Sequence, residues 1–150
     1  MTAFPDTSFL CAMYVSQDNS VLAAESFRAL PEALTVSSLL LYEFRQSVRF
    51  QVWLYSRDKS RGYPPERAEV ALSKLQLNLD AGAVVQAAVD WPDVHRRAEI
   101  ISQRHTRAGG HRSLDIVHVA TALHLGAQVF LSFDTNQRKL AAAEKLRAKP

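Results

Sequence analysis

Residues 112–141, RSLDIVHVATALHLGAQVFLSFDTNQRKLA, contain the pattern that decides the fold. From Asp115 onward, apolar residues recur every three or four positions, which predicts an amphipathic helix that stops near Gly126. Residues 129–133 (VFLSF) are apolar without alternation, which predicts a parallel strand covered on both faces. A terminal helix is expected over 137–146. This order of elements is typical of an α/β domain.

The rest of the chain continues the alternation of short strands and helices. We expect further strands at 2–5, 34–36 and 83–85, and helices at 7–14, 20–30, 38–55, 65–79 and 91–108. The alternation favours a three-layer α/β/α domain around a central parallel sheet of about four or five strands. Residues 1–150 contain no repeat or linker, so we expect a single domain whose basic C-terminal tail frays.

The composition is that of an ordinary globular protein, with 47% apolar and 22% charged residues. The net charge of +3 is only weak evidence for a nucleic-acid partner. The first residues lack a basic leader, and no window approaches the ~18 apolar residues of a membrane helix. We therefore expect a cytoplasmic protein without a membrane segment. The single cysteine, Cys11, excludes an internal disulfide and a cysteine-rich zinc site.

Acidic residues stand where predicted strands end or predicted helices begin. They are Asp6, Glu43, Asp115 and Asp134. The carboxyl ends of the strands form the ligand crevice of an open α/β sheet, so these carboxylates could converge there. Converging carboxylates repel each other unless a cation is bound, and oxygen ligands select Mg²⁺ or Mn²⁺ over zinc. Such a site suits phosphodiester hydrolysis.

Several of these residues have two open interpretations. Asp134 either belongs to the acidic site or only caps the helix that follows it. His118 lies three residues after Asp115, so it is either a metal ligand or a hydrogen-bonded residue at a helix interface. Glu43 has no basic neighbour at helical spacing, so the sequence indicates no ion-pair partner for it.

Four motifs resemble those of the PIN-domain family, and within it the VapC-type ribonuclease toxins of bacterial toxin–antitoxin pairs. The motifs are PDTSFL around Asp6, LLLYEF around Glu43, SLDIVHVATALHLGA around Asp115 and VFLSFDTNQRKLA around Asp134. The resemblance implies a metal-dependent endoribonuclease in which these acids are catalytic and Asp6, Asp115 and Asp134 bind Mg²⁺ or Mn²⁺. It also implies a supporting role for Ser8, with Asn136 as a further outer ligand.

The resemblance has two departures and implies two partners. Pro5 stands where the family usually has an ordinary strand residue, and the helix and basic loop over 49–63 are long. A small antitoxin and a second copy of the chain are the partners that the resemblance implies. The RNA target, the cleavage site and the number of metal ions are not indicated.

Two basic clusters flank the predicted site in the sequence. The first contains Arg57, Lys59 and Arg61, and the second contains Arg104, Arg107, His111 and Arg112. Each is either a solvated loop or a phosphate-binding surface. Because the second cluster leads directly into Asp115, we expect Arg107 and Arg112 to bind RNA.

Two rival functions remain. A haloacid-dehalogenase-like phosphatase also has an aspartate after its first strand, but it needs a second acid two residues later, and Ser8 occupies that position. A catalytically silent PIN-like domain that only binds RNA or a protein would need no active acids. All of the expected acids are present, so the sequence gives no sign of a lost site.

Overall fold

The computed structural model describes residues 2–150 and contains two parallel ladders of strands. The strands are β1 (Ala3–Pro5), β2 (Leu34–Val36), β3 (Val84–Gln86), β4 (Val129–Leu131) and β5 (Arg147–Lys149). One ladder has the order β1-β4-β5, and the other joins β2 to β3. Because β1 also lies beside β2, all five strands lie in one central layer.

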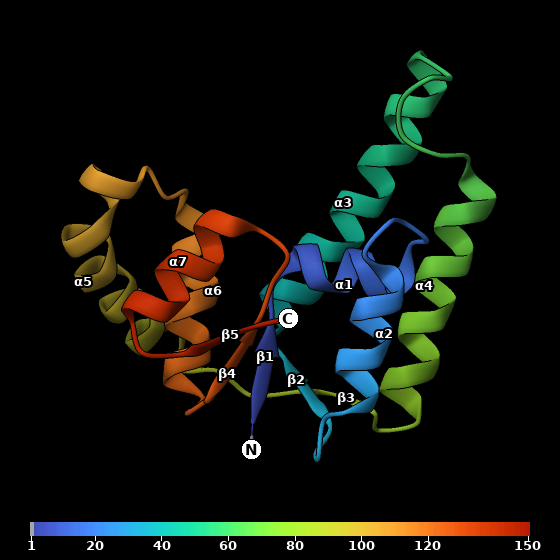
Figure 1. Ribbon diagram of the computed structural model, residues 1–150. Coiled ribbons are helices and arrows are strands. Elements are labelled where there is room, and N and C mark those ends of the chain that lie inside the picture. The colour runs from blue at the N-terminus through green and yellow to red at the C-terminus, as the bar shows by residue number, and fades with distance from the viewer. Residues whose placement is uncertain (1) are drawn as a thin grey trace.

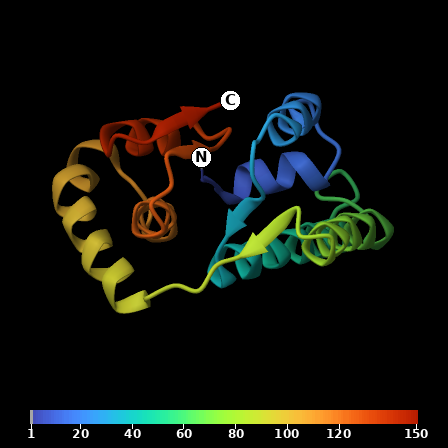
Figure 2. The same ribbon diagram turned by 90° about the horizontal axis from the view of Figure 1, so that it is seen from below.

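The helices fall into two groups, one on each side of the strands. They are α1 (Thr7–Tyr14), α2 (Ser20–Arg28), α3 (Ser38–Arg57), α4 (Pro65–Asp80), α5 (Trp91–Gly109), α6 (Ser113–His124) and α7 (Thr135–Ala143). Figures 1 and 2 show α1 to α4 on one side and α5 to α7 on the other. The three-layer α/β/α architecture and its parallel strands agree with the prediction.

Local sequence signals explain where several helices begin and end. Asp6 and Ser37 cap α1 and α3 by accepting hydrogen bonds from backbone N–H groups three residues later. Gly110 adopts a left-handed conformation, with φ of 65°, and ends α5. No helix within residues 2–150 has the length and apolar character needed to cross a membrane.

The core is built around strands β1 and β4, and the sequence pattern of β4 predicted that it is covered on both faces. Phe4 and Phe130 are fully buried and face each other in the parallel register, with ring centroids 6.4 Å apart. The same register pairs Pro5 with Leu131. The residues that follow these two strands are therefore neighbours, and this brings Asp6 to Ser132.

The C-terminal tail differs from the prediction. It does not fray but forms β5, which pairs with β4, and α7 ends at Ala143 rather than near residue 146. The sequence RAK lacks the apolar run of a central strand, so pattern analysis missed it. Such a sequence suits an edge strand, because exposed Arg147 and Lys149 discourage pairing with another chain.

Candidate active site

Asp6 is a buried carboxylate at the carboxyl end of β1. Its side chain is held by three donors: the Ser8 hydroxyl at 2.6 Å, the Ser132 hydroxyl at 2.5 Å and the Phe9 backbone N–H at 3.0 Å. Burial nevertheless outweighs these hydrogen bonds and raises the pKa of Asp6. The fold therefore holds a carboxylate in a place where its negative charge is poorly compensated, which is typical of functional sites.

Glu43 projects from the second turn of α3 and pairs with His118 of α6. Its Oε2 lies 2.8 Å from His118 Nε2, and its Oε1 accepts a hydrogen bond from the Thr7 hydroxyl at 2.5 Å. Burial favours the neutral carboxyl, but His118 and Thr7 outweigh it and lower the pKa of Glu43. The sequence indicated no basic partner at helical spacing, and the partner that Glu43 has comes instead from a distant helix.

His118 is 1% exposed and has an unsatisfied ring nitrogen. Its Nδ1 is buried and has no hydrogen-bond partner among the described residues. Of the two interpretations of His118, the structure shows the hydrogen-bonded residue at a helix interface.

Asp115 lies in the first turn of α6 and is partly exposed. Burial and the charges of Asp134 and Glu43 raise the pKa of Asp115, while Arg112 and His118 oppose the shift. Arg112 is a weak partner, with its Nε 4.0 Å from Asp115 Oδ2 and a side chain that is 89% exposed. The charges of two other carboxylates, Asp134 and Glu43, therefore act on Asp115.

Asp134 is exposed and caps α7. Its Oδ1 accepts a hydrogen bond from the Gln137 N–H at 2.7 Å. Its own N–H donates to the Ser132 hydroxyl at 3.0 Å, and the same hydroxyl donates to Asp6. Asp134 therefore caps α7, its charge also reaches Asp115, and Ser132 links this cap to the buried acid.

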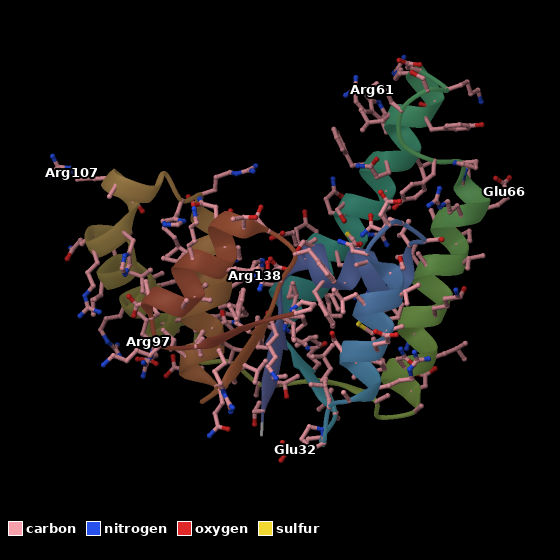
Figure 3. All side chains as sticks on the ribbon, in the orientation of Figure 1. Glu32, Arg61, Glu66, Arg97, Arg107 and Arg138 are labelled. Carbon is pink, nitrogen blue, oxygen red and sulfur yellow. The ribbon has the colours of Figure 1, made fainter. Side chains whose placement is uncertain are left out.

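The remaining predicted residues lie at different distances from this group. Ser8 contacts Asp6 and also accepts the Phe133 N–H at 2.9 Å, so it bridges the ends of β1 and β4. The Asn136 amide instead donates to the Gly109 carbonyl at 3.3 Å. Figure 3 shows Arg107 at the outer end of α5, pointing away from the strands.

The sequence matches a known protein family over most of its length. The family model for the PIN domain matches residues 3–143. The chain belongs to the PIN-domain family. No curated protein matches the sequence.

Solved structures share the PIN fold over nearly the whole chain. VapC20 of Mycobacterium tuberculosis, described as a sarcin-ricin loop cleaving toxin, has a TM-score of 0.64 and 20% identity and covers 99% of this chain and 100% of its own. VapBC2 of Rickettsia felis, bound to a DNA fragment from its promoter, has a TM-score of 0.62 and 14% identity over 99% and 98% of the chains. A toxin–antitoxin complex from Klebsiella pneumoniae has a TM-score of 0.55 and 15% identity over 89% and 88%.

Ser132 and Thr7 are contacts of the PIN-domain acids that sequence reasoning missed. Ser132 directly follows β4, and the register of β1 and β4 sets it against Asp6. Thr7 directly follows Asp6 and points to Glu43 instead. The position of a hydroxyl immediately after a strand was available in the sequence, but its partner depends on strand register and helix packing.

The acids of this PIN domain do not yet form a closed metal cage. Within residues 2–150, no three histidine, cysteine, aspartate or glutamate side chains are placed so that they could hold an ion as they stand. The chemistry of the donors nevertheless fits a hard cation, since all are carboxylate oxygens. The raised pKa values of Asp6 and Asp115 indicate uncompensated negative charge, which a cation would relieve.

Proposed function

We propose that this PIN domain is a metal-dependent endoribonuclease that hydrolyses RNA phosphodiester bonds. The observation that carries the proposal is the nearness of carboxylates from separate segments: the charges of Glu43 and Asp134 both raise the pKa of Asp115. A carboxyl group whose pKa is raised by neighbouring carboxylates is typical of a catalytic site. The alternating strands and helices bring these carboxylates together although the sequence separates them by many residues.

The proposed metal ligands are Asp6, Asp115 and Asp134, with Mg²⁺ or Mn²⁺ as the ion. When bound, the ion would lower the pKa of a water molecule and stabilise charge on the phosphate oxygens. Because no three of the described acidic, histidine or cysteine side chains are placed to hold an ion together, Asp115 and Asp134, the more exposed of the proposed ligands, would rearrange on binding. Ser8 and Ser132 would keep the buried Asp6 in place during that change.

Other side chains would transfer the proton and bind the RNA. Glu43, held by His118 and Thr7, would accept a proton from the attacking water. Attack at phosphorus would break its bond to the leaving 3′ oxygen. Arg112 would neutralise backbone phosphates next to Asp115, and Arg107 would contact phosphates farther along the RNA. Asn136 would act from the rim of the site.

The biological role that we propose is that of a toxin in a type II toxin–antitoxin pair. The support is the likeness of the fold to the toxin and toxin–antitoxin structures described above. A small antitoxin would then cover the acidic site, and the toxin would act in the cytoplasm as a homodimer. The charge of +3 is compatible with RNA as the substrate.

A silent PIN domain that binds RNA or protein is the second candidate. The observation in its favour is that the described acids form no ready metal cage. The two functions differ in their response to metal. A metal-dependent nuclease is stabilised when it binds the ion and loses activity when the ion is removed. A silent module shows neither effect.

The deciding experiment measures RNA cleavage and thermal unfolding together. We expect the purified chain to cleave RNA with Mg²⁺ or Mn²⁺ and not with EDTA, and we expect either metal to raise its unfolding temperature. Asp6→Asn and Asp115→Asn should lower cleavage by about 100-fold or more and remove the stabilisation by metal. A folded wild-type chain that neither cleaves a broad RNA panel nor responds to metal would contradict the proposal.

A further inference from the structure

The outer half of α3 carries an aromatic and basic surface that the acidic site does not use. We define this surface as the α3 track: Phe50, Trp53 and Arg57. The Phe50 and Trp53 rings are stacked, with centroids 5.4 Å apart and an interplanar angle of 26°. The Arg57 guanidinium lies 5.7 Å from the centroid of the Trp53 ring. The two rings are 48% and 50% exposed, so they contribute little to the core.

The spacing of the track connects it to the acidic site. Phe50 follows Glu43 by seven residues, and Arg57 follows Phe50 by seven more. Seven residues are close to two helical turns, so these three side chains project from nearly the same face of α3. Trp53 follows Phe50 by three residues and lies beside it. A ligand that leaves the acids along this face therefore meets the aromatic pair and then the arginine.

The charge around the track favours a polyanion as the ligand. Between Arg45 and Arg67 the sequence contains six arginine or lysine residues and two acidic residues, although the whole chain has a net charge of only +3. The neighbouring loop repeats the same pairing of rings and cations, with Lys59 Nζ 4.3 Å from the Tyr55 ring centroid. Figure 1 shows α3 extending beyond the rest of the fold, away from the strands.

We infer that the α3 track binds single-stranded RNA by stacking unpaired bases on Phe50 and Trp53, with Arg57 contacting a phosphate. Exposed aromatic rings in a basic groove are the usual platform for single-stranded nucleic acid. Rotation of the flexible Arg57 side chain frees the face of Trp53 and moves the guanidinium toward the backbone. The inference deepens the proposed nuclease function, because it names the part of the substrate that is held outside the acids.

The rival occupant is a protein, either a second copy of the chain or another partner. Tryptophan and arginine are also frequent at the centres of protein interfaces. The large apolar side chains exposed on α3 are Tyr42, Phe50 and Trp53, which is a smaller surface than a stable protein interface needs, and the residues between them are mostly charged or polar. The cationic surroundings therefore favour RNA.

The test measures binding separately from cleavage. In EDTA, which prevents metal-dependent hydrolysis, the full chain is titrated with a fluorescent oligoadenylate of about ten nucleotides. The Trp91→Phe variant leaves Trp53 as the only tryptophan, and we expect the oligonucleotide to quench its emission. Trp53→Ala should weaken binding by about tenfold, the size expected for loss of one stacked base. The matched control is Leu77→Ala, which removes a 67% exposed apolar side chain from α4.

The contribution of Arg57 is tested by salt. Arg57→Gln should reduce the slope of log affinity against log salt by about 0.7, the value for one phosphate contact on a single strand. Arg28→Gln, at the last residue of α2, is the matched control and should leave the slope unchanged. A slope that is the same in Arg57→Gln and wild type overturns the role of Arg57.

The outcomes separate this inference from the proposed nuclease function. If the wild type cleaves RNA and Trp53→Ala binds the oligonucleotide as tightly as Leu77→Ala does, the track is not an RNA site although the nuclease stands. If the oligonucleotide quenches Trp53 but no RNA is cleaved with metal, the track stands and the nuclease falls. If Trp53→Ala changes only the oligomeric mass, the surface is a contact between copies and the inference is overturned.

Discussion

Helix α6 makes two histidine–carboxylate contacts that are alike in length and different in setting. His118 Nε2 lies 2.8 Å from Glu43 Oε2, and His124 Nδ1 lies 2.7 Å from Asp93 Oδ2. The second ring nitrogen of His124 accepts the Asp90 N–H at 3.3 Å, so both of its nitrogens are used. His118 is buried and its Nδ1 is unpaired.

The two pairs differ in what surrounds the carboxylate. The His124 pair joins α6 to the start of α5. Arg96 and Arg97 form ion pairs with the same carboxylate of Asp93. Every partner there is satisfied, which is what stability alone requires. The His118 pair holds an acid among other acids and leaves a buried nitrogen without a partner. We therefore propose that the His118 pair positions Glu43 for the nuclease reaction, whereas the His124 pair only stabilises the fold.

His118→Ala gives the largest expected effect. Loss of the imidazole removes the hydrogen-bond partner that holds Glu43, so cleavage should fall by about 100-fold, the upper range for an outer contact of a metal site. The free energy of unfolding should fall by about 1–3 kcal/mol, because Glu43 is left partly buried without that partner. Initial cleavage rates and urea unfolding measure the two effects.

His118→Gln is the control for this variant, because its amide can still donate to Glu43. We expect it to recover part of both losses. An alanine variant that is destabilised but cleaves RNA like the wild type would show that the His118 pair is structural after all, as the His124 pair is.

Ser132→Ala should have the next largest effect. The Ser132 hydroxyl donates to Asp6 and accepts the Asp134 N–H, so its loss loosens two acids together. Because Ser8 still donates to Asp6, we expect cleavage to fall by only about tenfold. Ser73→Ala, on the exposed face of α4, is the matched control for the rate measurement. Equal rates in the two variants would contradict a positioning role for Ser132.

The sequence could predict the acids but not the contacts that hold them. Asp6 and Asp134 follow apolar runs, and that local pattern is enough to place them at strand ends. The partners of Asp6 and Glu43 depend instead on which strands pair and how α3 meets α6. Glu43 and His118 are 75 residues apart, and no periodicity within one element connects them.

Strands β4 and β5 also differ in whether their own residues or their tertiary contacts decide that they form. Strand β4 is a run of buried apolar residues and was found from its composition. Strand β5 exists because the edge of β4 offers it a partner, since its own residues carry no buried run. Its formation depends on tertiary context, which overrides weak local preference.

His124→Ala is expected to have a smaller effect, confined to stability. The variant loses the contacts to Asp93 and Asp90 that fasten α5 to α6, so its midpoint of urea unfolding should fall. Cleavage should stay close to the wild-type rate, because the pair holds none of the proposed catalytic acids. A loss of cleavage as large as that of His118→Ala would show that the two pairs do not differ in role.

The smallest expected effect is a change in acid stability at the His124 end of α6. The hydrogen bonds from Arg97 and His124 lower the pKa of Asp93 to about 2. The folded state therefore binds the Asp93 proton less readily than the unfolded state, and the resulting stability is present above the ordinary pKa and lost as pH falls toward 2. Asp93→Asn removes the stability that comes from the ionised Asp93 carboxylate. The unfolding midpoints of wild type and variant should therefore converge as the pH falls from about 5 to about 2. Midpoints that diverge as the pH falls would mean that Asp93 is not stabilised as an anion in the fold.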